Sequence, residues 1–280
     1  MLVQYFKNAL KTTNESFVIV IPMVIFYILL NLYLILTGRQ LNSNIKVFTA
    51  FLTIIFMTAV FFAGWFFMIS RAVKLSKRIF VLDEDAAKAH VTLLKYFPSG
   101  VGKFFLSCLG QILIAVLLFM LLTLIYFQTG TKLIGDVFTP EQITYMMTPS
   151  PDINELINKL TLEQNILLAK WGFLFLGFSF FTSYIIMFWA PEIIYRTPNP
   201  LMALIVAIKK LFKKPLKSFG FFVIINILNF LLSLLVTLTA KILFLYYFLS
   251  VFYLYFIVYV VVLIFSYYEG EFIKESEEED

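Results

Sequence analysis

The sequence predicts an all-α integral membrane protein with six transmembrane helices. Hydrophobic residues make up 61% of the 280 residues and charged residues only 14%, proportions that lie outside the usual range of soluble domains. Six apolar runs of at least about 20 residues, each long enough to cross a bilayer, occupy most of the chain. The stretches between them are too short for a separate soluble domain of ordinary size.

The apolar runs define the predicted spans. The first run lacks a small-residue cleavage site after it, which indicates a retained helix rather than a removed signal peptide. The spans form a single domain, residues 1–268, and an acidic tail, residues 269–280, follows. We expect this tail to be disordered because it is too polar to bury. The six spans are residues 17–37, 47–70, 104–127, 167–189, 219–239 and 242–268.

The distribution of Lys and Arg predicts the orientation of the chain in the membrane. Sixteen of these residues lie in four segments, residues 1–16, 71–103, 190–218 and 269–280, and five lie in the other connecting segments. Cytoplasmic loops carry the excess of Lys and Arg in membrane proteins, so both termini are predicted to be cytoplasmic. The composition, rich in Lys, Phe and Ile and poor in Cys, suggests a bacterial cytoplasmic membrane.

A short amphipathic helix is predicted directly before the fifth span. Asn199 is a good N-cap, and Pro200 suits the first helical position, where its missing N–H has no consequence. Lysines gather toward the C-terminal end of this helix, and Pro215 ends it. Such a helix fits the membrane interface, with its apolar face toward acyl chains and its lysines among anionic headgroups.

The same plan recurs along the chain, which indicates an internal repeat. A shift of 114 residues aligns Asp85 with Asn199 and Lys95 with Lys209, and a weaker third copy covers residues 5–17. We therefore expect three helical hairpins, each preceded by a cytoplasmic amphipathic interfacial helix. The alternative is that basic cytoplasmic loops produce this likeness by composition alone. The candidate contacts to anionic headgroups are Lys95, Lys103, Lys209, Lys210, Lys213, Lys214 and Lys217.

Polar residues inside the spans fall on defined helical faces, which point into the protein because an unpaired amide facing lipid is unfavourable. Two interpretations remain open, a polar cavity between the third, fourth and fifth spans or a network of interhelical hydrogen bonds. The absence of a charged side chain deep in any predicted span favours the network. The residues concerned are Gln111, Ser179, Ser183, Asn226, Asn229, Ser233 and Thr237.

The sequence offers little that is typical of an enzyme. His90 is the only histidine and Cys108 the only cysteine, and no glycine-rich phosphate loop or nucleophile elbow is present. We therefore predict no catalytic residue, no metal site and no cofactor. Glu192, which directly follows the fourth span, is a candidate for a cytoplasmic gate or for a structural ion pair.

Three short motifs carry a resemblance to known proteins: Ala190–Ile194, Asn199-Pro200 and Ala207–Leu211. In these motifs the chain resembles uncharacterised six-span prokaryotic membrane proteins. That group includes the membrane domain that precedes the catalytic domain of some glycerophosphodiester phosphodiesterases. The resemblance implies a six-helix fold with helices lying on the membrane. The phosphodiesterase activity is not implied, because this sequence contains no catalytic domain.

Taken together, these features predict a non-enzymatic membrane protein. It would be a scaffold or accessory subunit that binds anionic lipid and a partner protein on the cytoplasmic side, with no nucleic-acid partner. The alternative is a permease or lipid-handling protein with a polar cavity between the third, fourth and fifth spans. A cavity lined by Gln111, Asn226 and Asn229 would favour the alternative.

Overall fold

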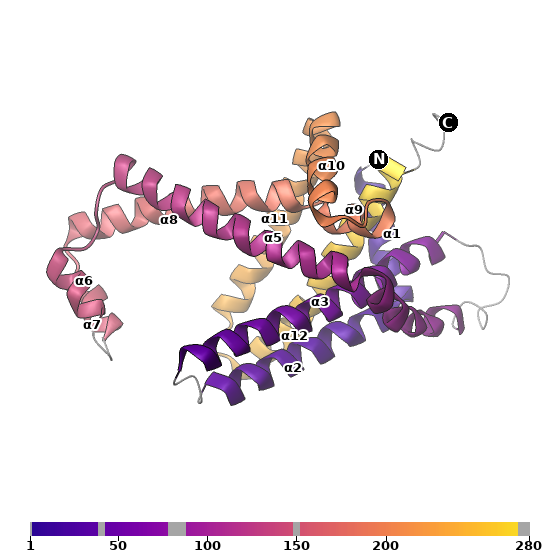
Figure 1. Cartoon of the computed structure of the whole chain (residues 1–280), viewed down its shortest axis with the longest axis horizontal. Helices are drawn as coiled ribbons and strands as arrows, with labels where there is room; N and C mark the ends of the chain where they lie inside the picture. The colour runs from indigo at the N-terminus through magenta and orange to yellow at the C-terminus, as the bar shows by residue number, and fades with distance from the viewer. Residues whose placement is uncertain (1, 39–42, 78–87, 148–151, 274–280) are drawn as a thin grey trace. The chain divides into compact units, whose positions relative to one another are not determined.

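The structure, a computed structural model, describes residues 2–38, 43–77, 88–147 and 152–273. Within these ranges the chain is helical and contains no strand (Figure 1). The elements are α1 (Leu2–Glu15), η1 (Phe17–Ile19), α2 (Val20–Gly38), α3 (Asn44–Leu75), η2 (Thr92–Lys95), α5 (Tyr96–Leu133), α6 (Pro140–Met146), α7 (Ile153–Asn158), α8 (Leu162–Ile186), α9 (Trp189–Tyr195), α10 (Pro200–Lys213), α11 (Pro215–Leu238), α12 (Leu243–Tyr268) and η3 (Glu269–Ile273).

Six helical stretches among the described residues are long and apolar enough to cross a membrane, which confirms the expected number of spans. Large apolar side chains are exposed along several of these helices, as at Leu36, Leu117 and Phe173. Exposure on this scale fits a lipid-facing surface, because soluble monomers rarely expose large contiguous apolar patches. The stretches are Phe17–Gly38, Asn44–Leu75, Lys88–Leu133, Leu162–Tyr195, Pro215–Leu238 and Leu243–Ile273.

The chain forms two compact units, which are described separately. The first consists of Met1–Ile114 and Ile185–Asp280, and the second of Ala115–Tyr184. In the second unit, Trp171 on α8 donates its indole N–H to the carbonyl of Gly135 (3.0 Å), and Tyr126 on α5 donates to the carbonyl of Trp171 (3.2 Å). These bonds fasten α8 to α5 and to the chain that follows α5.

The helix predicted before the fifth span is present as α10. The side chain of Asn199 accepts hydrogen bonds from the backbone N–H groups of Leu201 and Met202, both at 3.1 Å. α10 starts at Pro200 and ends at Lys213, just before Pro215, as the capping signals predict; α11 then starts at Pro215, four residues before the predicted fifth span. Trp189 on α9 donates its indole N–H to the carbonyl of Pro200 (2.7 Å), so the start of α10 is tied to α9.

α1 lies alongside α12. The rings of Tyr5 and Tyr267 pack edge to face with centroids 5.3 Å apart. Farther along α12, Tyr259 donates to a backbone carbonyl of α1 (3.4 Å), and the hydroxyl of Tyr255 donates to Asn14. These contacts extend over roughly 18 Å of α12 at 1.5 Å per residue. α1 supplies hydrogen-bond partners that the α12 tyrosines need. Its expected place in the membrane interface stays a prediction.

The first residues of the acidic tail are ordered, which corrects the expectation of a disordered segment from residue 269 onward. η3 is a turn of π-helix that continues α12, and Glu269, Glu271 and Phe272 within it are buried. The Phe272 ring packs on Phe188, with centroids 5.4 Å apart. This apolar contact, together with paired charges described below, makes burial favourable. Residues 274–280 lie outside the described residues.

α3 and α5 approach each other closely at two glycines. A Cβ atom added to Gly100 would lie 2.6 Å from the carbonyl oxygen of Ala63 and 2.7 Å from Cβ of Phe67. A Cβ atom on Gly64 would lie 2.8 Å from the ring of Phe97. Small residues allow such close approach of helix backbones. Gly102, also on α5, has nothing within 4 Å of an added Cβ atom.

We expect Gly100→Ala to destabilise the protein by about 1–3 kcal/mol, because the new methyl group overpacks against the α3 backbone. Gly102→Ala is the matched control. It should be neutral or stabilise by up to about 1 kcal/mol through helix propensity. Denaturant unfolding in detergent, followed by tryptophan fluorescence, measures both. Equal stability of the two variants would contradict the close α3–α5 contact.

Candidate functional site at a buried ion-pair cluster

Three carboxylates are buried where several helices of the first unit end, and each is paired with lysine. The exposed fraction of the side chain is 1% for Glu192, 5% for Glu271 and 9% for Glu269. Buried carboxylates require such pairing, because an isolated charge in an apolar interior is strongly unfavourable. We call this group the ion-pair cluster; its members are Glu192, Glu269, Glu271, Lys77, Lys210, Lys214 and Lys217.

Glu192 on α9 is held by three side chains. Its Oε2 atom lies 2.7 Å from Nζ of Lys210 on α10 and also accepts a hydrogen bond from the hydroxyl of Tyr268. Its Oε1 atom accepts from the hydroxyl of Thr197 (2.7 Å). The Lys210 ammonium also lies over the Tyr268 ring, 4.6 Å from its centroid. Of the two roles considered for Glu192, this geometry corresponds to an ion pair.

Burial acts on the lysine of this pair. Loss of hydration lowers the pKa of Lys210, and the hydrogen bond to Glu192 opposes that shift by favouring the charged form. The neighbouring charges of Arg196 and Lys213 lower the pKa further. The Glu192 carboxylate therefore favours the charged form of Lys210 against the effect of burial.

The two acids of η3 pair with different helices. Oε2 of Glu271 lies 2.9 Å from Nζ of Lys214 and 3.6 Å from Nζ of Lys217, at the start of α11. Oε2 of Glu269 lies 2.6 Å from Nζ of Lys77, which follows α3. Residues two apart along a helix point in roughly opposite directions. η3 therefore connects α11 on one side with the end of α3 on the other.

The cluster brings together segments that the Lys and Arg distribution placed on one side of the membrane. Lys77 comes from segment 71–103, Glu192 and Lys210 from 190–218, and the η3 acids from 269–280. Segment 1–16 joins them through Tyr5, whose hydroxyl donates to Oε1 of Glu271 (3.2 Å). All four predicted cytoplasmic segments thus contribute to one site.

The predicted headgroup lysines divide into two groups. Lys210, Lys214 and Lys217 belong to the ion-pair cluster, so their charges are already paired. The other four are exposed, and none makes an ion pair with a residue that the structure describes. These four, which we call the exposed lysines, are Lys95, Lys103, Lys209 and Lys213.

The polar residues of the fifth span are spread between interior and surface. Asn226 donates to a carbonyl of its own helix (2.9 Å), and Asn229 accepts from the hydroxyl of Tyr253 on α12 (2.9 Å). Ser233 and Thr237 are exposed, and Thr237 donates to the Ser233 carbonyl (2.9 Å). Among the described residues, Asn229 is therefore the one of these four whose side chain bonds to another helix.

The remaining polar candidates belong to different units. Ser179 and Ser183 line a pocket of about 380 Å³ between α5 and α8 in the second unit, where the other lining groups are mostly aromatic rings and Thr123. Gln111 belongs to the first unit, and its buried Oε1 atom has no hydrogen-bond partner among the described residues. A cavity shared by the third, fourth and fifth spans stays a prediction.

Sequence reasoning missed the contributions of Tyr5, Lys77, Tyr268 and the two η3 acids. The acids were assigned to the tail because seven acidic residues fall within 269–280. A signal was nevertheless present: Phe272 and Ile273 continue the apolar pattern of the last span beyond these acids. Apolar residues interleaved with acids indicate a helix end that packs on the protein.

Comparison with protein families, with curated proteins and with solved structures finds no match for this chain. The resemblance to six-span prokaryotic proteins therefore stays an expectation, and functional inference rests on the geometry described above. Within the described ranges, no group of three or more His, Cys, Asp or Glu side chains is arranged to hold a metal ion.

The ion-pair cluster predicts very different roles for two adjacent lysines. Lys210→Met leaves the Glu192 carboxylate buried without its cation and should lower the free energy of unfolding by about 3–5 kcal/mol. Lys209→Met changes an exposed side chain and should alter it by about 0.5 kcal/mol or less. Denaturant titration of both variants in the same detergent measures the difference.

A double variant provides the control for this comparison. Glu192→Leu combined with Lys210→Met removes both charges, and it should be more stable than Lys210→Met alone because no uncompensated charge remains. Equal losses for Lys209→Met and Lys210→Met would show that the pair does not form.

Proposed function

We propose that this chain is a non-enzymatic integral protein of the cell membrane, with both termini in the cytoplasm, that acts as a scaffold or accessory subunit binding anionic lipid. The observation that supports this most is that some cytoplasmic-side lysines pair with buried acids whereas four others are exposed. The ion-pair cluster neutralises the buried acids, and the four exposed lysines keep their positive charge for an external partner. A lysine close to an anionic membrane surface contributes roughly 1 kcal/mol to lipid attraction.

The three-hairpin arrangement is part of this proposal. α10 precedes α11 and carries Lys209 and Lys213 near its C-terminal end, where cations also interact favourably with the helix dipole. Lys95 and Lys103 lie at the end of η2 and in the first turns of α5, the corresponding place before the third span. Both pairs of lysines therefore lie at the start of a candidate span, which supports the proposed contact with lipid headgroups.

A protein partner would meet the same cytoplasmic face. The exposed lysines give this face a positive charge, so an acidic partner segment is favoured over a basic one. The ion-pair cluster ties the ends of several helices to one another, which supports a docking role for this face.

The alternative, a permease or lipid-handling protein, draws support from one observation. The side-chain oxygen of Gln111 is buried without a hydrogen-bond partner among the described residues, as is typical of a group that awaits a ligand or water. Gln111→Leu separates the two functions. It should abolish transport in a permease and leave lipid binding intact in a scaffold.

Replacing the four exposed lysines tests the proposed function. The variant Lys95→Gln/Lys103→Gln/Lys209→Gln/Lys213→Gln should lose most of its enrichment of anionic lipid when it is extracted with its surrounding lipids in polymer nanodiscs. Lipid analysis by mass spectrometry measures this enrichment relative to the bulk membrane. At roughly 1 kcal/mol per lysine, the loss should exceed about tenfold.

The control variant removes the same charge on the opposite side, at three lysines of the predicted outer segments and at Lys170, just inside the outer end of the fourth span: Lys46→Gln/Lys132→Gln/Lys170→Gln/Lys241→Gln. These lysines are also exposed. The control should retain the enrichment of the unmodified protein. Equal enrichment in both variants would refute a cytoplasmic lipid-binding face.

Chemical labelling tests the proposed orientation. With the buried Cys108 replaced by Ala, a single cysteine is introduced by Lys209→Cys or by Lys241→Cys. In intact bacterial cells, a membrane-impermeant maleimide should label the Lys241→Cys variant alone, and lysis should be required for the Lys209→Cys variant. The reverse pattern would overturn the proposed sidedness.

A further inference from the structure

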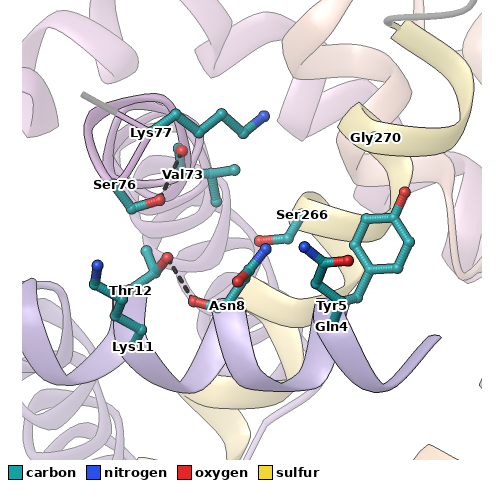
Figure 2. Close-up of a pocket in the computed structure, with 10 residues that line it drawn as sticks. All are labelled: Gln4, Tyr5, Asn8, Lys11, Thr12, Val73, Ser76, Lys77, Ser266 and Gly270. Atoms are coloured by element: carbon teal, nitrogen blue, oxygen red, sulfur yellow. Dashed lines mark hydrogen bonds between the residues drawn. The ribbon is translucent and has the colours of Figure 1, made fainter. Parts of the chain in front are cut away.

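A polar pocket of about 450 Å³ lies where α1 meets the ends of α3 and α12 (Figure 2). All of its lining residues except Val73 and Gly270 have polar side chains. The ends of α3 and α12 indicate where the pocket lies along the candidate spans. Lys77 lies just beyond α3, and Gly270 just beyond α12. The pocket therefore lies beside the ends of two candidate spans, where apolar chain gives way to polar chain, and this position favours contact with lipid headgroups.

Several side chains of the pocket have unused hydrogen-bonding capacity. Gln4 and Asn8 lie one helical turn apart on the same side of α1, and Figure 2 shows them near Ser266 of α12. None of these three side chains donates or accepts a hydrogen bond within the described part of the chain. A polar pocket so lined is suited to a ligand that brings its own donors and acceptors.

Two lysines supply positive charge. Lys11 lies 3.6 Å from Glu15, and the two side chains are 66% and 40% exposed, so this surface pair is weak. Lys77 contacts Glu269 with its ammonium group at 2.6 Å. An ammonium carries three N–H donors, so two more remain for a second anion. Lysine ammonium groups beside neutral amide donors are a common environment for phosphate oxygens.

We propose that this pocket binds a phosphate-bearing group, with Lys11 and Lys77 contacting the phosphate and with Gln4, Asn8 and Ser266 bonding its polar substituents. The phosphate belongs either to a membrane phospholipid or to a soluble phosphate compound, and the chemistry of recognition is the same for both. The inference rests on the proposed lipid-binding function and deepens it. It adds one specific binding site to the non-specific attraction that the exposed lysines exert on anionic lipid.

Binding measurements on the whole chain in detergent test the site. The probes are a short-chain phosphatidylglycerol and inorganic phosphate, and native mass spectrometry gives the number bound and the dissociation constant. In Asn8→Ala/Lys11→Gln, we expect one high-affinity site to weaken by about tenfold, since a hydrogen bond to a charged group is lost. Both residues are exposed on α1, so the variant should fold.

The matched control is Lys7→Gln, which makes the same charge change on α1 outside the pocket and should leave this affinity unchanged. Phosphatidylglycerol binding that depends on Asn8 and Lys11, without competition by inorganic phosphate, identifies a lipid. Competition by millimolar inorganic phosphate identifies a soluble phosphate compound. Equal affinity of the double variant and the unmodified protein for both probes overturns the proposal.

The outcome is separable from that of the proposed function. Substitution of the exposed lysines should reduce weak, multiple lipid binding and leave the pocket site unchanged. If the pocket variant loses its site while the exposed-lysine variant keeps its anionic lipid, the pocket stands and the lipid-binding face fails. If the exposed-lysine variant alone loses lipid, the lipid-binding face stands and the pocket fails.

Discussion

Burial of three carboxylates at the end of a helical bundle is the constraint on which the first unit depends. Each acid requires a cation, because an unpaired buried charge costs several kcal/mol. Lys77 meets this requirement from one part of the chain, and Lys210, Lys214 and Lys217 meet it from another. The ends of α3, α10, α11 and α12 are therefore held together by charge.

The need to pair the buried acids also separates the polar groups into two kinds. Lysines that pair with the buried acids stabilise the fold, whereas the exposed lysines and the pocket beside α1 are the groups to which we assign ligand binding in our proposals. Tyr5 links the two, since its hydroxyl donates to Glu271 and its ring lines the pocket. A ligand in the pocket would thus contact a residue that also holds η3 in place.

Much of the fold could be predicted because it depends on local signals. Apolar length defined the six spans, and Asn199 and Pro200 defined the start of α10. The partners of Glu192 were not predictable, since Lys210 and Tyr268 come from other helices and periodicity carries no information about which helices meet. The acids of η3 were misassigned because charge composition was weighed above the apolar Phe272 that follows them. The polar stripe predicted a shared face, yet Ser233 and Thr237 are exposed.

Hydrogen exchange of the backbone amides of Glu269–Ile273 tests the ordered, buried η3 most directly. In detergent, with mass-spectrometric detection, we expect these amides to exchange at least about 100-fold more slowly than an unstructured chain, because they are hydrogen-bonded in a helix that the ion pairs hold against the protein. Lys214→Met should accelerate their exchange. Exchange at the rate of an unstructured chain in the unmodified protein would contradict the ion-pair cluster and restore the interpretation of residue 269 as the start of a disordered tail.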